Sequence, residues 1–497
     1  MVPTLLVPTV LVNAGRFTLR EDAMTQEKVD PGTDTALPPK KLRPIQALVL
    51  GLVGMGYGDL LATLGAYLMI FSPTAPLLTV AMVFLVILAV AQVVAFFAKR
   101  YVGRGGLLTY AFNAGGTGPG VLTGATLLIG NVLLVAVVVA NCAIYAISVF
   151  VHFGVPAASP IMQTAVLAGI GIVSTLICLR GLRSAADAGG ILGLICLPFV
   201  AWVLIQGGLT MGVDWGLIFN FDLTAFDPSI FVVGLVIAGS SYFGFEQVTT
   251  LAADTESPKR SIPLILFGCV AVGAPVMLLS LVFGARTGIL HVDAIEAGES
   301  PLAILANAAD LQWLAVPLDV MVLASSLALL IAVQTYGSQL ISTMGEIGLL
   351  PRRLSHRSSR RNVPVAAIVT TGVIAIVAPM LVALISGGSP VDTAIYLNQP
   401  IGYLWAIAYI VIGVLALWVI ARTSGRHWLT ASCALVVVIG FVVILAFSMK
   451  DGFSTMFAAE AWIAVILVAL LFTVFWILHV IRSRAGHIDM TRMDEVE

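Results

Sequence analysis

The chain has 497 residues, of which 59% are hydrophobic and only 10% charged, and its mean hydropathy is +1.05. A water-soluble domain of this length does not carry such a composition, and the formal net charge of −1 points to no particular partner. Continuous apolar runs of about 20 residues, the length of a membrane-spanning helix, recur from residue 45 onward. The composition therefore predicts an all-α integral membrane protein rather than a β-barrel, whose strands would give short alternating segments.

The amino-terminal arm, residues 1–43, is polar, contains proline and lacks periodicity, so we expect it to be disordered. Either Met1 or Met24 can be the true start. Hydropathy then predicts about 12 transmembrane helices, with limits uncertain by several residues. These spans are 45–70, 77–98, 119–150, 163–182, 187–208, 229–253, 262–285, 315–345, 364–386, 393–420, 427–448 and 458–481.

Basic residues follow every even-numbered span. Arg100 and Arg104 follow the second, Lys259 and Arg260 the sixth, and a cluster of arginines at 352–361 follows the eighth. Acidic residues dominate the loops between them. Because basic loops remain on the cytoplasmic side, both termini are expected to be cytoplasmic.

Glycines crowd the centre of the first span, in Gly54, Gly56 and Gly58, and each weakens a helix by about 1 kcal/mol relative to alanine. Close helix packing would account for glycines alone. It does not account for Asp59, because an acid at mid-span costs about 2.5 to 3.5 kcal/mol unless it is paired or hydrated. The first span is therefore predicted to be broken.

The sixth span carries a second interruption. Ser240, Ser241 and Gly244 are poor helix formers halfway across an apolar run, and Glu246 follows within a turn. In hydrocarbon, an interrupted helix is tolerated only where protein or a water-filled cavity satisfies the freed backbone groups. Two broken helices five spans apart would form inverted repeats whose breaks meet near the bilayer midplane.

The sixth span and the loop after it also resemble a known family. Tyr242-Phe243-Gly244-Phe245-Glu246 and Ser257-Pro258-Lys259-Arg260-Ser261-Ile262-Pro263 are similar to the F-x-G-F-E and N-P-x-R-x-I-P patterns of amino acid-polyamine-organocation (APC) permeases. The loop 103–120 and the end of span eight, 344–351, resemble two further family motifs. The resemblance implies a LeuT-like fold with five-plus-five inverted repeats and broken helices 1 and 6.

The sequence departs from the family at several positions. Tyr57 and Asp59 are unusual in the first-helix signature, and Phe243 stands where a small residue is commoner. Gln339 replaces an arginine that is usual in span eight, and Glu346 reverses the charge of another.

By resemblance, the unwound parts of helices 1 and 6 would bind the carboxylate and ammonium of an amino acid. The candidate substrate-binding residues are Met55, Gly56, Tyr57, Gly58, Ser240, Ser241, Tyr242 and Gly244. The candidate coupling or gating residues are Asp59, Glu246, Ser325 and Ser326.

Several of these residues have more than one interpretation. Tyr242 would be an aromatic gate over the substrate or an interior packing residue. Glu246 would couple an inner gate to the substrate or cap the broken helix. Ser325 and Ser326 lie where sodium-coupled relatives bind sodium, although serine in a membrane helix commonly bonds its own backbone. The coupling ion therefore stays open between a proton and sodium, and span five lacks the lysine of some proton-coupled relatives.

Other polar residues of the spans favour structural roles. Asn131 and Asn141 in span three, and Asn398 and Gln399 in span ten, are interpreted as interhelical hydrogen-bonding residues. The sequence lacks the motifs of membrane proteases, ATPases and hydrolases, so we expect no enzyme activity, no cofactor, no metal and no nucleic-acid partner.

The sequence thus predicts a secondary transporter of amino acids or related organic amines in the cell membrane, working by alternating access. Residues 44–421 would be the transport core, 422–481 two peripheral helices and 482–497 a cytoplasmic tail. One alternative is a carrier for amines without a carboxylate, in which Asp59 pairs with the substrate ammonium. Another is a transport-dead amino acid sensor.

Overall fold

The computed structural model describes residues 41–155, 160–221, 226–296, 299–358, 361–386, 390–423, 425 and 427–484. These residues belong to one compact unit, Pro39–Glu497. The expected arm and most of the expected tail lie outside them, so the domain limits stay predictions.

Regular structure in this part of the chain is helical, apart from one isolated parallel bridge between Leu42 and Thr255. The first half contains α1 (Pro44–Val53), α2 (Tyr57–Phe71), α3 (Pro76–Ala98), α4 (Leu107–Gly115), α5 (Thr117–His152), α6 (Pro160–Cys178), α7 (Leu182–Met211), α8 (Trp215–Ile218) and α9 (Pro228–Ser240). The second half contains η1 (Phe245–Asp254), α10 (Pro258–Gly284), α11 (Thr287–Leu290), α12 (Val292–Glu296), α13 (Pro301–Ala308), η2 (Gln312–Leu314), α14 (Ala315–Glu346), η3 (Arg352–Ser355), α15 (Val365–Ser386), α16 (Pro390–Arg422), α17 (Trp428–Ser448) and α18 (Met456–Arg484).

Each expected span coincides with a helix or with a broken pair of helices. Among the described residues, 11 helical segments are long and apolar enough to cross a membrane. The remaining expected span, the fifth, coincides with α7. Within α7, residues Cys196–Met211 form an apolar helical segment that is shorter than the other 11. The membrane fold class is confirmed, whereas the count of 12 stays a prediction.

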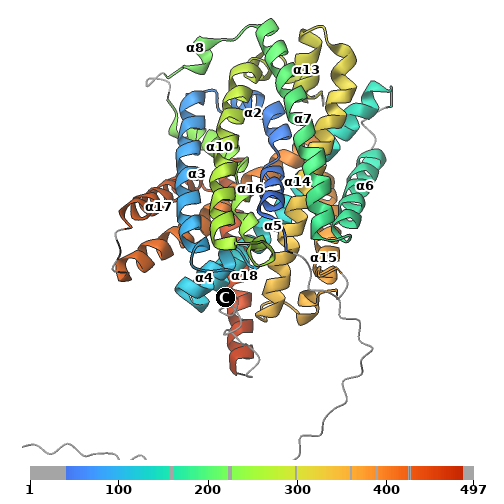
Figure 1. Ribbon diagram of the computed structural model, residues 1–497. Coiled ribbons are helices and arrows are strands. Elements are labelled where there is room, and N and C mark those ends of the chain that lie inside the picture. Colours follow the sequence, from blue (N-terminus) through green and yellow to red (C-terminus); the bar gives the residue numbers. More distant parts are fainter. Residues whose placement is uncertain are drawn as a thin grey trace, which may run out of the picture. The chain divides into compact units, whose positions relative to one another are not determined.

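The bundle is built around α5, which packs against both α14 and α16. Of the most apolar stretch of the third span, 72% is buried, against 22% for α17 and 17% for α18. The last two helices therefore present most of their surface outward. The short helices α8 and α13 lie at one end of the bundle and α4 at the opposite end (Figure 1).

Both expected helix breaks are present. The first span divides into α1 and α2 at Gly54–Gly56, and Gly56 has a φ of 59°, a left-handed conformation that glycine adopts without steric cost. The sixth span divides into α9 and the 3₁₀ helix η1, with Gly244 at a φ of 95°. Within η1, the hydroxyls of Thr249 and Thr250 donate to the carbonyls of Glu246 and Gln247, which satisfies backbone acceptors of this irregular segment.

Candidate functional site

A cavity of about 140 Å³ lies beside the two helix breaks. Its wall is formed by the α1–α2 break, α2, α5, the end of α9, α14 and α16. A cavity of similar volume, about 150 Å³, accommodates benzene in an engineered protein, so this one has room for a small organic ligand.

The cavity extends along α2 from Asp59 to Phe71. Leu42, just before α1, pairs with the backbone of Asp254 and Glu256, so α1 begins near the end of η1. Because α2 continues the first span beyond the break, it runs away from this end of the bundle. The lining therefore reaches from the breaks toward the end that carries α8 and α13.

Asp59 is the acid that borders this cavity. It lies in the first turn of α2 and is half-buried. Tyr145 Oη donates to its Oδ1 at 2.7 Å, and Asn141 Nδ2 donates to its Oδ2 at 3.1 Å, both from α5. A carboxylate can accept about four hydrogen bonds, so Asp59 keeps acceptor capacity after these two.

No lysine, arginine or histidine stands among the described residues that line the cavity. The Asp59 carboxylate is therefore held by neutral donors rather than by a protein cation. Such a site favours a ligand that brings a positive charge of its own.

The structure divides the candidate substrate-binding residues into two groups. Met55, Gly56, Ser240 and Ser241 line the cavity, as does Asp59. The others, Tyr57, Gly58, Tyr242 and Gly244, are not part of its lining. Their roles in binding remain predictions.

Tyr57 and Tyr242 both point toward α10. Tyr57 Oη donates to the carbonyl of Cys269 at 2.5 Å, and Tyr242 Oη donates to the next carbonyl, that of Val270, at 3.5 Å. Both side chains are buried. In this conformation the two tyrosines attach the two broken spans to the same turn of α10.

Glu246 lies on η1, buried below the breaks, with 1% of its surface exposed. Trp405 Nε1 donates to its Oε1 at 2.8 Å and Tyr409 Oη donates to its Oε2 at 2.6 Å. Both donors belong to α16. The carboxylate therefore connects the second half of the sixth span to the tenth, and its coupling role stays a prediction.

Ser325 and Ser326 are buried on α14, outside the cavity lining. Ser325 lies directly against Gly58, where a methyl group would come within 2.5 Å of its Oγ. The Oγ of Ser326 has no hydrogen-bond partner among the described residues. It is an available oxygen, as an ion site would require.

The polar residues of the third and tenth spans form two groups, those with an interhelical hydrogen bond and those with an unpartnered oxygen. Asn141 bonds to Asp59, and Asn398 Nδ2 donates to Ser240 Oγ at 3.1 Å, so both make the interhelical hydrogen bonds that the sequence suggested. Both also border the cavity. Gln399 also borders the cavity, but its buried Oε1 and the buried Oδ1 of Asn131 accept no hydrogen bond from the described residues. Sequence reasoning assigned all four to one class and missed this difference.

Comparison with known proteins shows to which family this chain belongs. The family model described as "Amino acid permease" matches residues 46–475, which is nearly the whole chain. The chain belongs to the amino acid permease family.

The fold of this permease is similar to that of a solved structure. The crystal structure of MhsT in complex with L-phenylalanine superposes with a TM-score of 0.56 at 14% sequence identity, covering 80% of this chain and 98% of that one. MhsT has a LeuT-like fold, so this similarity confirms the fold class expected from the sequence.

Curated relatives match shorter stretches of the permease. It is 27% identical over 219 residues to "Cationic amino acid transporter 4, vacuolar" of Arabidopsis thaliana, covering 41% of this chain and 34% of that protein. It is 24% identical over 137 residues to "Branched-chain amino acid permease BcaP" of Lactococcus lactis subsp. cremoris (strain MG1363), covering 28% of this chain and 29% of that one. The matches thus span about a third of the length of these relatives.

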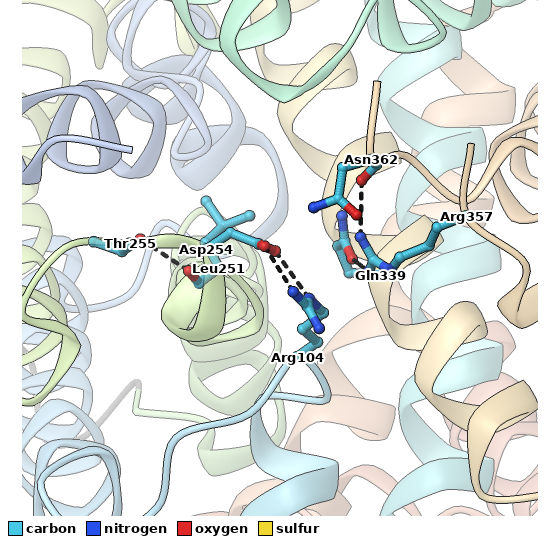
Figure 2. Close-up of polar contacts among 7 residues, drawn as sticks. All are labelled: Arg104, Leu251, Asp254, Thr255, Gln339, Arg357 and Asn362. Atoms are coloured by element: carbon cyan, nitrogen blue, oxygen red, sulfur yellow. Dashed lines mark hydrogen bonds and ion pairs between the residues drawn. The ribbon is translucent and has the colours of Figure 1, made fainter. Parts of the chain in front are cut away.

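At the α4 end, an ion pair connects the loop before α4 to the end of η1. Arg104, in the loop before α4, faces Asp254 at the end of η1 (Figure 2). Its Nε donates to Oδ2 at 3.1 Å and its Nη2 to Oδ1 at 2.9 Å, the two-point geometry of a strong arginine–carboxylate pair. The hydrogen bonds to Asp254 raise the pKa of Arg104, so the guanidinium keeps its positive charge.

The amino-terminal segment is attached to the same end of η1. The backbone N–H of Leu42 donates to the carbonyl of Asp254 at 2.7 Å, and the N–H of Glu256 donates to the carbonyl of Leu42 at 2.9 Å. Tyr336 Oη on α14 donates to the carbonyl of Leu50 on α1 at 3.0 Å. Together these bonds attach α1 to the end of η1 and to α14.

A second arginine lies beside the ion pair. Arg357, from the loop after η3, donates to Gln339 Oε1 on α14 and to the carbonyl of Asn362 (Figure 2). Burial and then the like charge of Arg104 lower the pKa of Arg357. The guanidinium of Arg357 therefore reaches the position in span eight where Gln339 stands in place of the family's arginine.

Proposed function

We propose that this permease is a secondary transporter that carries amino acids or related organic amines across the cell membrane by alternating access around the cavity at Asp59. The observation that carries the proposal is that, among the described residues lining the cavity beside the two helix breaks, Asp59 is the one acid and none is a cation. Backbone groups freed at the breaks would hold the polar groups of the substrate, and Asp59 would pair with its ammonium.

The arrangement of the two ends supports alternating access. The Arg104–Asp254 pair and the Leu42 backbone bonds close the α4 end, while the cavity lining extends toward the other end. With both termini in the cytoplasm, the α4 end is cytoplasmic, and this conformation is closed on the inside.

One observation favours the narrower alternative of a carrier for amines without a carboxylate. The amino-terminal end of a helix attracts negative charge, and in α2 the first turn already contains Asp59. A substrate carboxylate at the same helix end would meet that charge. An amine without a carboxylate would not.

Two coupling ions remain compatible with the site. A proton would reside on Asp59, which borders the cavity. Sodium would use the hydroxyls of Ser325 and Ser326, and the unpartnered Oγ of Ser326 favours this choice.

The test uses the purified permease in liposomes, with uptake of labelled amino acids and amines measured under proton and sodium gradients. Asp59→Asn keeps the size of the side chain and removes its charge. If Asp59 carries the proton, the variant loses gradient-driven accumulation and keeps counterflow exchange. If Asp59 pairs with the substrate ammonium, the variant loses binding itself.

A variant that accumulates substrate at the wild-type rate and affinity would refute both roles of Asp59. A wild-type protein that binds an amino acid and moves none would instead be a sensor.

A further inference from the structure

A second cavity, of about 330 Å³, shares part of its wall with the cavity at Asp59. It is lined by α3, the residues before α9, α9 itself, α16 and α17, and every described residue of this lining is apolar or glycine. The lining of the cavity at Asp59, in contrast, includes serine and asparagine side chains. A cavity with apolar walls stays dry and accepts apolar groups.

Among the described residues, Phe243 alone borders both cavities. It lies within the second break, between α9 and η1, and 8% of its surface is exposed. Two glycines of the second cavity lie against its ring. A methyl group on Gly402 of α16 would be 3.2 Å from its Cε2, and one on Gly239 of α9 would be 3.3 Å from its Cζ. The ring therefore lies between two helices at positions where neither supplies a side chain.

At this place the partition between the two cavities is the side chain of Phe243. If the ring were removed, Gly239 and Gly402 could not replace it, because a glycine has no side chain to fill the space. A protein core collapses only in part around a deleted ring. Phe243→Ala should therefore connect the cavity at Asp59 with the apolar space of the second cavity.

With the partition in place, the cavity at Asp59 offers little room. Its volume of about 140 Å³ is close to that of an engineered cavity, about 150 Å³, which benzene fills. L-alanine has as many non-hydrogen atoms as benzene, whereas L-phenylalanine has twice as many. A bulky side chain would need the space that the ring of Phe243 occupies, and forcing extra atoms into a packed site is unfavourable.

We propose that Phe243 is a specificity-determining residue of this permease, whose ring limits the side chain of the substrate and restricts transport to small amino acids or small amines. The inference rests on the proposed transport function and narrows its substrate by size. The polar groups of the substrate would stay at the breaks and at Asp59, and its side chain would end against the ring. A site can reject a ligand by such a steric clash without any change in its attractive contacts.

The test compares L-alanine with L-phenylalanine, which have the same polar groups and differ in the side chain. Binding to the purified permease is measured by titration and thermal shift, and counterflow is measured in liposomes. The wild type should prefer L-alanine. Phe243→Ala should raise the affinity for L-phenylalanine relative to that for L-alanine by about tenfold or more, because the phenyl group can then enter the apolar space of the second cavity.

Ethylamine and phenethylamine have the same two side chains without the carboxylate, so they extend the test to a carrier of amines. Phe243→Leu shortens the side chain less than alanine does and should shift the ratio of affinities in the same direction by a smaller factor. It serves if Phe243→Ala does not fold.

Phe447→Ala is the matched control. Phe447 lies on α17 and borders the second cavity but not the cavity at Asp59. Its truncation enlarges the second cavity and leaves the partition intact, so the ratio of affinities should stay at the wild-type value.

The inference is overturned if Phe243→Ala retains the wild-type ratio in both pairs of ligands, or if Phe447→Ala shifts the ratio equally. It is also overturned if the wild type binds the larger member of a pair at least as tightly as the smaller one. In these cases the proposed function still stands. A wild-type permease that carries no amino acid or amine in counterflow overturns both.

Discussion

Removing the guanidinium of Arg104 should make the α4 end of the permease, which is the cytoplasmic end in the proposed topology, open more often. The side chains of Arg104 and Asp254 are 30% and 14% exposed, so solvent screens their attraction in part. Pairs of this kind contribute up to about 1 kcal/mol, and the two-point geometry places this one at the upper end. Arg104→Ala should therefore raise the population of the open state by about fivefold.

The assay is the reaction of a cysteine that is protected while this end is closed. Leu340 on α14 is 2% exposed and borders a small cavity between η1, α5 and α14, on the α4 side of the breaks. Leu340→Cys is combined with Cys433→Ser, because Cys433 is partly exposed whereas the other four cysteines are buried. An impermeant thiol reagent should react with the new cysteine at position 340 from the cytoplasmic side only. The rate should be proportional to the population of the state in which the α4 end is open.

Two controls separate the ion pair from the loss of any arginine. Arg100→Ala removes a nearby cation that donates to the carbonyl of Phe96 and lies over its ring, and it should leave the labelling rate unchanged. The reversed pair Arg104→Asp with Asp254→Arg should restore slow labelling. Labelling of the Arg104→Ala protein at the wild-type rate would show that the pair does not hold this end closed, and labelling from outside would reverse the topology.

Two other predictions follow from the same contacts. Gly56→Ala should reduce stability by about 1 to 2 kcal/mol and weaken substrate binding, because alanine is strained at a φ of 59° and its methyl group would come within 2.6 Å of Leu329 Cδ2. Gly440→Ala, with nothing closer than 4.0 Å, should not destabilise the protein; equal melting temperatures of the two variants would contradict the argument. Gln339→Arg and Arg357→Gln should each lower the melting temperature, and the double variant should recover most of the loss because it returns one guanidinium to the same place. If the losses of melting temperature in the double variant are additive, a guanidinium at position 339 does not replace the one at position 357.

The sequence predicted those features of the permease whose cause is local. Apolar runs located the spans. The clusters at Gly54–Gly58 and Ser240–Gly244 located both breaks, because these residues are poor helix formers and a lipid-facing helix would not contain them at its centre. The cost of an acid at mid-span also singled out Asp59, which does border the cavity.

Side-chain direction and partner choice were beyond the sequence, because both depend on how helices far apart in the chain are rotated against each other. Tyr242 lies within the break, yet its hydroxyl points to α10 rather than into the cavity. Asp59 is bonded by residues more than 80 positions away, and Arg104 and Asp254 are separated by 150. The amides Asn398 and Gln399 are adjacent in sequence, and only their surroundings show that one is satisfied and the other is not.

The two helices on either side of the first break, α1 and α2, are attached to different parts of the bundle, so the break allows them to move independently. On one side, Asp59 on α2 is fixed to α5 by Tyr145 and Asn141. On the other, α1 is held at the α4 end through Leu42 and Leu50. Residues Gly54–Gly56 join the two without regular helix. If the attachments of α1 release, we expect α1 to move while α2 stays on α5, so the α4 end can open without displacing the Asp59 carboxylate at the cavity.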